Sequence, residues 1–308
     1  MTTSTTDTAA PAPPTTAAYD TTKPSEPEAP TGAPLVGRDL TIGYDRRVIS
    51  VGLDVEIPAG EFTVIVGPNA CGKSTLLRAL SRLLQPRNGQ VLLDGRDIAR
   101  LRSKDVAKRL GLLPQSSIAP EGISVADLVA RGRNPHQGLF RQWTSTDEQA
   151  VTDALAATNT VDLADRLVDE LSGGQRQRVW VAMALAQQTE LLLLDEPTSF
   201  LDVAHQVELL ELFGHLNHQG RTIVAVLHDL NQACRYGTHV IAMREGEIVA
   251  EGRPEQIITA DLVSDVFGLD AVVIEDPVEG GPMVVPRRGP RPTRPDDHSA
   301  LANPAHLR

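Results

Sequence analysis

The chain of 308 residues is 41% hydrophobic and 22% charged, so it has enough apolar content for one large or two small folded domains. Its formal net charge of -11 argues against general nucleic-acid binding, which requires a basic surface. Two cysteines are too few for a disulfide framework, no apolar run is long enough to span a bilayer, and no signal-peptide pattern begins the chain, so we expect a cytoplasmic protein.

The two ends of the chain have compositions typical of disordered tails. Residues 1–34 consist mainly of Thr, Ala and Pro and contain no Leu, Ile, Val, Phe or Trp, so ordering them would bury too little apolar surface to offset the lost entropy. Residues 287–308 are rich in Pro and Arg. We therefore expect the folded chain to lie between residues 35 and 286.

Strands of two kinds are predicted within this range. Residues 35–44 and 48–57 are short apolar bursts separated by turn-forming residues, which favours antiparallel strands. Continuous apolar runs, typical of parallel strands covered on both faces, occupy residues 62–66, 191–194 and 222–227. The sequence therefore predicts an α/β fold with a mostly parallel core sheet and an antiparallel N-terminal β subdomain.

Residues 116–170 are expected to form a helical subdomain between two of the parallel strands. Helical patterns occupy residues 127–130 and 147–157. The second of these helices is predicted to begin with a capping box in which Ser145 and Glu148 satisfy each other's backbone N–H groups.

The segment after the first continuous apolar run has the pattern of a phosphate-binding loop, Gly-x4-Gly-Lys-Ser. Gly67 and Gly72 permit a tight turn whose backbone N–H groups point inward as an anion cradle, beside the positive end of the helix dipole. Lys73 supplies a cation for the β- and γ-phosphates, and Ser74 supplies a hydroxyl ligand for Mg²⁺. We expect the Cys71 thiol to be accessible in the free protein and shielded by a bound nucleotide with its Mg²⁺. The residues expected to bind the nucleotide are Gly67, Pro68, Asn69, Ala70, Cys71, Gly72, Lys73, Ser74 and Thr75.

Two carboxylates follow the apolar run at residues 191–194, at the strand end where ligands bind in doubly wound sheets. Asp195 is expected to hold the Mg²⁺ shell, and Glu196 to polarise a water in line with the γ-phosphate. His228 follows the next apolar run at the same edge of the sheet, where it can hydrogen-bond the γ-phosphate. A lone histidine is more often structural, and its position beside the carboxylates is what favours the functional interpretation.

The string Leu171-Ser172-Gly173-Gly174-Gln175 precedes a helix that is predicted to extend to about residue 188. A serine hydroxyl and unshielded backbone amides at a helix start form a second anion site, without a lysine. One nucleotide has no evident need of two such sites on one subunit, whereas two subunits facing head to tail would use both. The sequence therefore predicts a head-to-tail dimer with a second copy of the chain.

In order and spacing, these motifs resemble those of the ATP-binding cassette family. The likeness covers about residues 35–255 and rests on GPNACGKST, Gln115, LSGGQRQR, LLLLDEP, Ser199-Phe200-Leu201-Asp202 and His228. It implies a P-loop NTPase fold with a helical signature subdomain at about residues 116–170 and a C-terminal extension at 256–286. It also implies ATP hydrolysis that depends on Mg²⁺.

The same resemblance implies roles for further residues. Tyr44 would stack on adenine, Gln115 would link the Mg²⁺ and water site to a membrane partner, and Asp202 would lie at the dimer seam. The residues that would contact ATP held by the other subunit are Ser172, Gly173, Gly174 and Gln175. The expected catalytic residues are Glu196, His228, Lys73 and Gln115, and the expected Mg²⁺ ligands are Ser74, Gln115 and Asp195.

Longer strings look more narrowly like the ATPases of bacterial iron–siderophore importers, among them ARGRNPHQGLF at residues 130–140 and HDLNQACRYGTHVIAMREGEIVAEG at 228–252. This likeness implies a subunit at the cytoplasmic face of the membrane that powers uptake of a ferric siderophore. The transmembrane permease subunits would be separate chains, served by a substrate-binding protein. ATPases of cobalamin or haem importers, and a soluble cassette ATPase such as an iron–sulfur assembly type, stay open as alternatives. A non-cassette kinase or GTPase would leave LSGGQ without a role.

Overall fold

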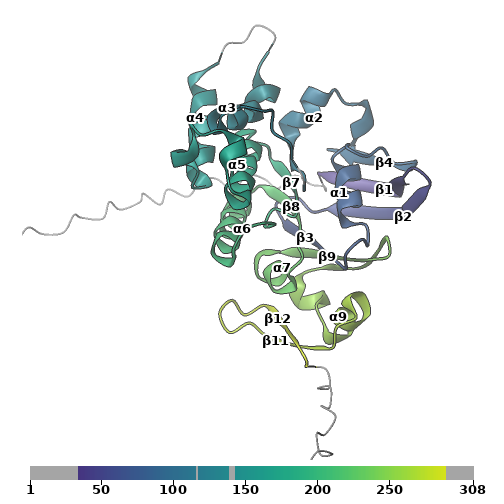
Figure 1. The fold of residues 1–308 in the computed structure, drawn as a ribbon. Coiled ribbons are helices and arrows are strands. Elements are labelled where there is room, and N and C mark those ends of the chain that lie inside the picture. The colour runs from purple at the N-terminus through teal and green to yellow at the C-terminus, as the bar shows by residue number, and fades with distance from the viewer. Residues whose placement is uncertain (1–33, 116, 139–142, 289–308) are drawn as a thin grey trace, which may run out of the picture.

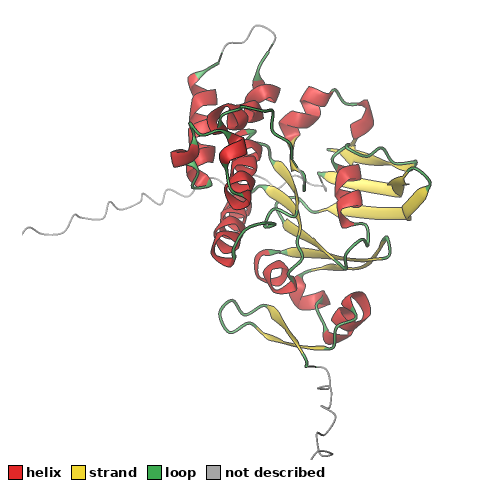
Figure 2. Ribbon diagram, in the orientation of Figure 1, coloured by secondary structure: helices red, strands yellow, loops and turns green. Residues whose placement is uncertain are grey.

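The computed structural model describes residues 34–115, 117–138 and 143–288. Its central strands are β3 (Phe62–Val66), β6 (Leu110–Leu113), β7 (Leu191–Asp195), β8 (Thr222–Val226), β9 (His239–Arg244) and β10 (Glu247–Gly252). They form one sheet in the order β10-β9-β3-β8-β7-β6, in which all neighbours are parallel except β9 and β10 (Figure 1, Figure 2). The predicted mostly parallel core sheet is therefore confirmed.

Hydrophobic cores lie on both faces of this sheet. The helices that contribute to them include α1 (Lys73–Leu80), α5 (Gly173–Ala186) and α6 (Val203–His218). Because side chains alternate along a strand, Leu192 and Leu194 of β7 pack in the core with α5 and α6, whereas Leu191 and Leu193 pack in the core with α1. Burial on both faces explains why the central strands read as continuous apolar runs.

A second, antiparallel sheet packs beside α1. Its strands are β1 (Leu35–Tyr44), β2 (Arg47–Ile57), β4 (Asn88–Leu93) and β5 (Arg96–Asp97). They are arranged in the order β2-β1-β4-β5, and buried residues of β1 such as Leu35, Leu40 and Ile42 join the core around α1. The predicted N-terminal β subdomain is therefore confirmed.

Short helices lie between α1 and α5 in the chain. They are η1 (Ile98–Arg100), α2 (Ser103–Arg109), α3 (Val125–Ala130), η2 (Arg131–His136), α4 (Ser145–Ala157), η3 (Val161–Leu163) and η4 (Val168–Glu170). Of these, α3 and α4 form the upper left of the view in Figure 1. The capping box of α4 is formed by Thr144 and Asp147, so the prediction of Ser145 and Glu148 is wrong by one residue. Asp147 takes this place because it is buried against Arg133, whose Nε lies 3.0 Å from its Oδ1.

Besides β9 and β10, small elements follow β8 in the chain. They are α7 (Leu230–Tyr236), α8 (Pro254–Ile257), α9 (Ala260–Phe267), β11 (Ala271–Glu275) and β12 (Pro282–Pro286). Among them α7 packs against β3, and α8 and α9 pack against β9. β11 and β12 pair as a separate antiparallel sheet, here called the C-terminal hairpin, which packs against α7 (Figure 1).

Some predicted features fall on residues that the structure does not describe. Residues 116 and 139–142 of the helical subdomain lie outside the described residues, as does most of the two expected tails, at 1–33 and 289–308. Within the described part of the chain, no helix is both long enough and apolar enough to cross a bilayer.

Candidate active site

The phosphate loop, residues 67–74, joins β3 to α1 at the carboxyl edge of the parallel strands. Gly67 and Gly72 have φ angles of +153° and +114°, which other residues rarely adopt. A Cβ atom at Gly67 would lie 2.2 Å from the main-chain oxygen of Met243, so the loop passes too close to β9 for any side chain at this position. This is the tight turn that the sequence predicts.

Lys73 reaches back over the phosphate loop from the first turn of α1. Its side chain is buried, and its Nζ donates to the main-chain oxygens of Gly67 at 2.8 Å and Pro68 at 2.9 Å. These bonds fix the cation against the backbone of the turn, where it can meet a bound phosphate.

The Cys71 side chain points into the protein. It is 5% exposed and belongs to the core around α1, and a Cβ atom at Gly67 would lie 2.8 Å from its Sγ. The expectation of an accessible thiol is therefore wrong for this conformation. Cys234 is also buried, and burial raises the pKa of its thiol to about 12.

We expect neither thiol of the folded protein to react readily with a maleimide, with or without MgATP, because burial keeps the reagent from the sulfur. Mass spectrometry of timed samples measures the labelling rate, and Cys234→Ser reports on Cys71 alone. The protein unfolded in guanidinium is the reference for an open thiol. Rapid labelling of Cys71 that MgATP suppresses would contradict the packing described here.

Ser74 and Asp195 form the part of the site that suits a metal ion. Ser74 Oγ donates to Asp195 Oδ1 at 2.7 Å, whereas the buried Asp195 Oδ2 has no hydrogen-bond partner among the described residues. Burial raises the pKa of Asp195 above the ordinary carboxyl value, and the bond from Ser74 opposes this shift. A cation beside these oxygens would compensate the unpaired carboxylate, and oxygen ligands are those that Mg²⁺ prefers. The residues present therefore fit the ion.

Glu196 and His228 meet where β7 and β8 end. His228 Nε2 lies 2.8 Å from Glu196 Oε1, and Glu196 Oε2 accepts from Ser199 Oγ at 3.3 Å. Glu196 has a φ of +54°, in the left-handed region that is sparsely populated by residues other than glycine. Glu196 and His228 both line the cavity at the phosphate loop. The Glu196 carboxylate therefore lies next to the place where a phosphate would bind.

A cavity of about 280 Å³, here called the loop cavity, brings Tyr44 together with six of the nine predicted phosphate-loop residues; Gly67, Pro68 and Cys71 do not line it. Tyr44, at the end of β1, is 40% exposed and its hydroxyl accepts from Arg78 at 3.0 Å. Arg47 and Ile49 also line the cavity, although the sequence analysis did not predict them. The one feature that could have indicated them is their position just after Tyr44 in the chain. The lining residues are Tyr44, Arg47, Ile49, Asn69, Ala70, Gly72, Lys73, Ser74, Thr75, Glu196 and His228.

Other predicted site residues do not line the loop cavity. Ser172 and Gln175 form a capping box at the start of α5, with N–O distances of 3.1 and 3.3 Å. Asp202 caps α6 by accepting from the backbone N–H of His205 at 3.0 Å. Gln115 is exposed two residues beyond the end of β6. The predicted second anion site is therefore not part of the loop cavity of the same chain.

Comparisons with known proteins agree with this geometry. The family model described as ABC transporter matches residues 51–199. The ferric enterobactin transport ATP-binding protein FepC of Escherichia coli (strain K12) is 57% identical over 255 residues, which cover 82% of this chain and 94% of the relative. The iron(3+)-hydroxamate import ATP-binding protein FhuC of Bacillus subtilis (strain 168) is 47% identical over 245 residues, covering 79% and 91%.

A solved structure is similar as well. The dimeric ATP-binding cassette MJ0796, in a post-hydrolysis state bound to ADP and Pi, matches with a TM-score of 0.63 and 28% identity, covering 71% of this chain and 98% of that chain. The fold, the phosphate loop and relatives matched over nearly their full length lead to one conclusion. The chain belongs to the ABC transporter family, as one of its ATP-hydrolysing cassettes.

Proposed function

We propose that this ATPase powers the uptake of a ferric siderophore through separate transmembrane permease subunits, working at the cytoplasmic face of the membrane. The support comes from the relatives, which are named for ferric enterobactin transport and iron(3+)-hydroxamate import and are matched over 94% and 91% of their lengths. A substrate-binding protein that delivers the chelate to the permease is part of the same proposal. The cassette itself does not have to ligate iron, because the cargo passes through the permease.

At the site, the nucleotide would be held from both ends. Tyr44 would stack on the adenine, and Lys73 with the amides of the phosphate loop would bind the β- and γ-phosphates. Mg²⁺ would be held by Ser74 and Asp195, with Gln115 as a further ligand. When bound, the ion neutralises charge that develops on the phosphates during transfer.

Glu196 is the proposed general base. It would orient a water in line with the γ-phosphate and take its proton, while His228 holds the carboxylate and hydrogen-bonds the γ-phosphate. The observation that carries this assignment is the 2.8 Å contact between Glu196 and His228 at the loop cavity.

A second copy of the chain is proposed to complete each site. The residues that would cover ATP bound to the other protomer are Ser172, Gly173, Gly174 and Gln175. Asp202 would lie at the seam between the two copies. Two observations support this: these residues lie away from the loop cavity of their own chain, and the cassette solved with ADP and Pi is dimeric.

Removing this protein from its host is expected to abolish uptake of a ferric siderophore and to slow growth when iron is scarce. Uptake of a radiolabelled iron chelate measures the effect. The wild-type chain should restore uptake, and Lys73→Ala, which removes the phosphate-binding cation, should not. Unchanged uptake of iron chelates together with lost cobalamin or haem uptake would reassign the cargo and leave the ATPase unaffected.

A further inference from the structure

The histidine of the candidate site is joined directly to a short helix. His228 follows β8, and α7 begins two residues later at Leu230. Asp229 caps α7, since its Oδ1 accepts from the backbone N–H groups of Asn231 at 2.8 Å and Gln232 at 3.0 Å. Any shift of α7 therefore moves the backbone that carries His228.

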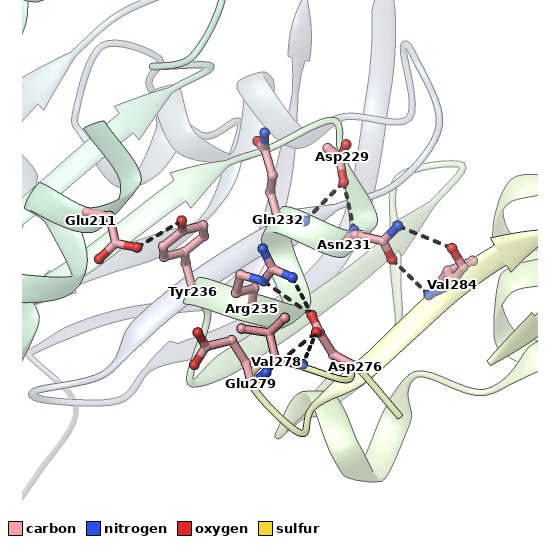
Figure 3. Close-up of polar contacts among 10 residues, drawn as sticks. All are labelled: Glu211, Asp229, Asn231, Gln232, Arg235, Tyr236, Asp276, Val278, Glu279 and Val284. Atoms are coloured by element: carbon pink, nitrogen blue, oxygen red, sulfur yellow. Dashed lines mark hydrogen bonds and ion pairs between the residues drawn. The ribbon is translucent and has the colours of Figure 1, made fainter. Parts of the chain in front are cut away.

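One face of α7 is held by the C-terminal hairpin (Figure 3). The Asn231 side chain bonds both main-chain groups of Val284 in β12: its Nδ2 donates to the carbonyl oxygen at 3.2 Å, and its Oδ1 accepts from the N–H at 2.7 Å. One turn further along α7, Arg235 donates to Asp276 Oδ2 from Nε at 3.2 Å and Nη2 at 2.6 Å. The other oxygen of Asp276 accepts from the backbone N–H of Val278 at 2.9 Å, which anchors the ion pair in the hairpin turn.

Another face of α7 is tied to the segment that carries Glu196. Gln232 Nε2 donates to Gln206 Oε1 in α6 at 2.9 Å. Gln206 Nε2 in turn donates to the main-chain oxygen of Leu201 at 3.0 Å, in the loop that joins Glu196 to α6. The helix α7 therefore bridges the two segments whose side chains meet in the Glu196–His228 contact.

We propose that Asn231 and Arg235 are positioning residues for hydrolysis: they dock α7 on the C-terminal hairpin and thereby fix His228 against Glu196. This inference rests on the proposed roles of Glu196 and His228. His228 needs such support because its side chain is half-exposed, so packing alone does not fix its imidazole. Displacing a group that takes part in the reaction by about 1 Å can cost about a hundredfold in rate.

A hairpin that only covered the hydrophobic core would behave differently. Val284 is 4% exposed and packs in that core, so the hairpin also contributes to stability. A purely structural cover would change the fraction of folded molecules but not the rate per folded molecule. A positioning element changes that rate, and does so only through His228.

The first measurement is the steady-state hydrolysis of MgATP by the full-length chain. Asn231→Ala is expected to lower kcat roughly tenfold, because it should displace His228 by less than the roughly 1 Å that costs about a hundredfold. Asp276→Ala repeats the test from the hairpin side. KM for ATP should stay at the wild-type value because neither residue lines the loop cavity. The matched control is Asp270→Ala. It removes an exposed ion pair at the base of the hairpin, in which Arg287 Nε lies 3.8 Å from Asp270 Oδ1, and it should leave kcat unchanged.

The second measurement makes Asn231→Ala in a His228→Ala background. His228→Ala alone should lower kcat, and adding Asn231→Ala should lower it no further, because the effect passes through His228. Equal fold losses in both backgrounds, or an unchanged kcat for Asn231→Ala and Asp276→Ala alone, would overturn the positioning role and leave the proposed site standing. A wild-type kcat for His228→Ala would refute the proposed site and this inference with it.

Discussion

Glu196→Gln is expected to bind ATP with wild-type affinity and to hydrolyse it at least about a hundredfold more slowly, the usual contribution of a general base. The amide keeps the size of the side chain and can still contact His228 and Ser199, but it cannot take a proton from water. Because ATP is then bound and not cleaved, the protein should stay dimeric in MgATP. Single-turnover hydrolysis, nucleotide binding and light scattering measure the three effects.

The matched control is Glu208→Gln, which makes the same chemical change at an exposed position of α6. It should hydrolyse ATP at the wild-type rate and return to the same oligomeric state after turnover. Near-normal hydrolysis by Glu196→Gln would remove Glu196 from the role of base. A slow variant that stays monomeric in MgATP would count instead against the proposed second copy.

Arg133→Met is expected to destabilise the fold by about 3–5 kcal/mol, the usual result of removing one partner of a buried ion pair. Arg133 is 4% exposed and Asp147 1%. The guanidinium also donates through Nη1 to the main-chain oxygen of Ala186 at 2.8 Å and to Gln188 Oε1 at 2.9 Å. Methionine can fill the space but leaves a buried carboxylate without its cation. Urea unfolding of the full chain, followed by circular dichroism, measures the loss.

The matched control is Arg102→Met, which removes an exposed ion pair with Asp105 (N–O distance 2.7 Å) and should cost far less, because solvent screens an exposed pair. The effect of Arg133→Met should also shrink in acid. The Thr144 hydroxyl and the Arg133 guanidinium hold the pKa of Asp147 below its ordinary value. The stabilisation is therefore complete above the ordinary pKa of about 3.9 and is lost as the pH falls through the folded-state value. Equal losses for the two methionine variants would show that burial adds nothing to this pair.

Features encoded by neighbouring residues could be predicted from the sequence. The change from a continuous apolar run to a helical period located the phosphate loop and Lys73. Because the ends of parallel strands share one edge of the sheet, the carboxylate Glu196 and His228 could be placed together although they are distant in the chain, and the structure shows their side chains 2.8 Å apart.

The sequence could not show which of two overlapping residue pairs forms the capping box of α4. Thr144 with Asp147 and Ser145 with Glu148 both fit a capping box, and they differ by one residue. The contact that decides between them is the burial of Asp147 against Arg133, which lies outside the helix. A local pattern carries no information about that partner.

Contacts between segments that are distant in the chain also could not be predicted from the sequence. The direction of the Cys71 side chain depends on how closely the phosphate loop passes β9. The string ARGRNPHQGLF has no chemical pattern of its own, yet a Cβ atom at Gly132 would lie 2.3 Å from the main-chain oxygen of Met183 in α5. Part of this string is therefore determined by packing within the chain.

The hydrogen bonds around Arg133 also fix the C-terminal end of α5. Arg133 ties the helical subdomain to Ala186 at the last turn of α5, and the next residue, Gln187, donates to the main-chain oxygen of Leu110 in β6 at 3.3 Å. This end of the helix is therefore clamped to the sheet, and Ser172 lies at the opposite end, 14 helical residues or about 21 Å away. A tilt of about 10° around the clamp would carry Ser172 through about 4 Å. Since that distance exceeds the length of a hydrogen bond, such a tilt would be enough to make or break a contact with the proposed second copy.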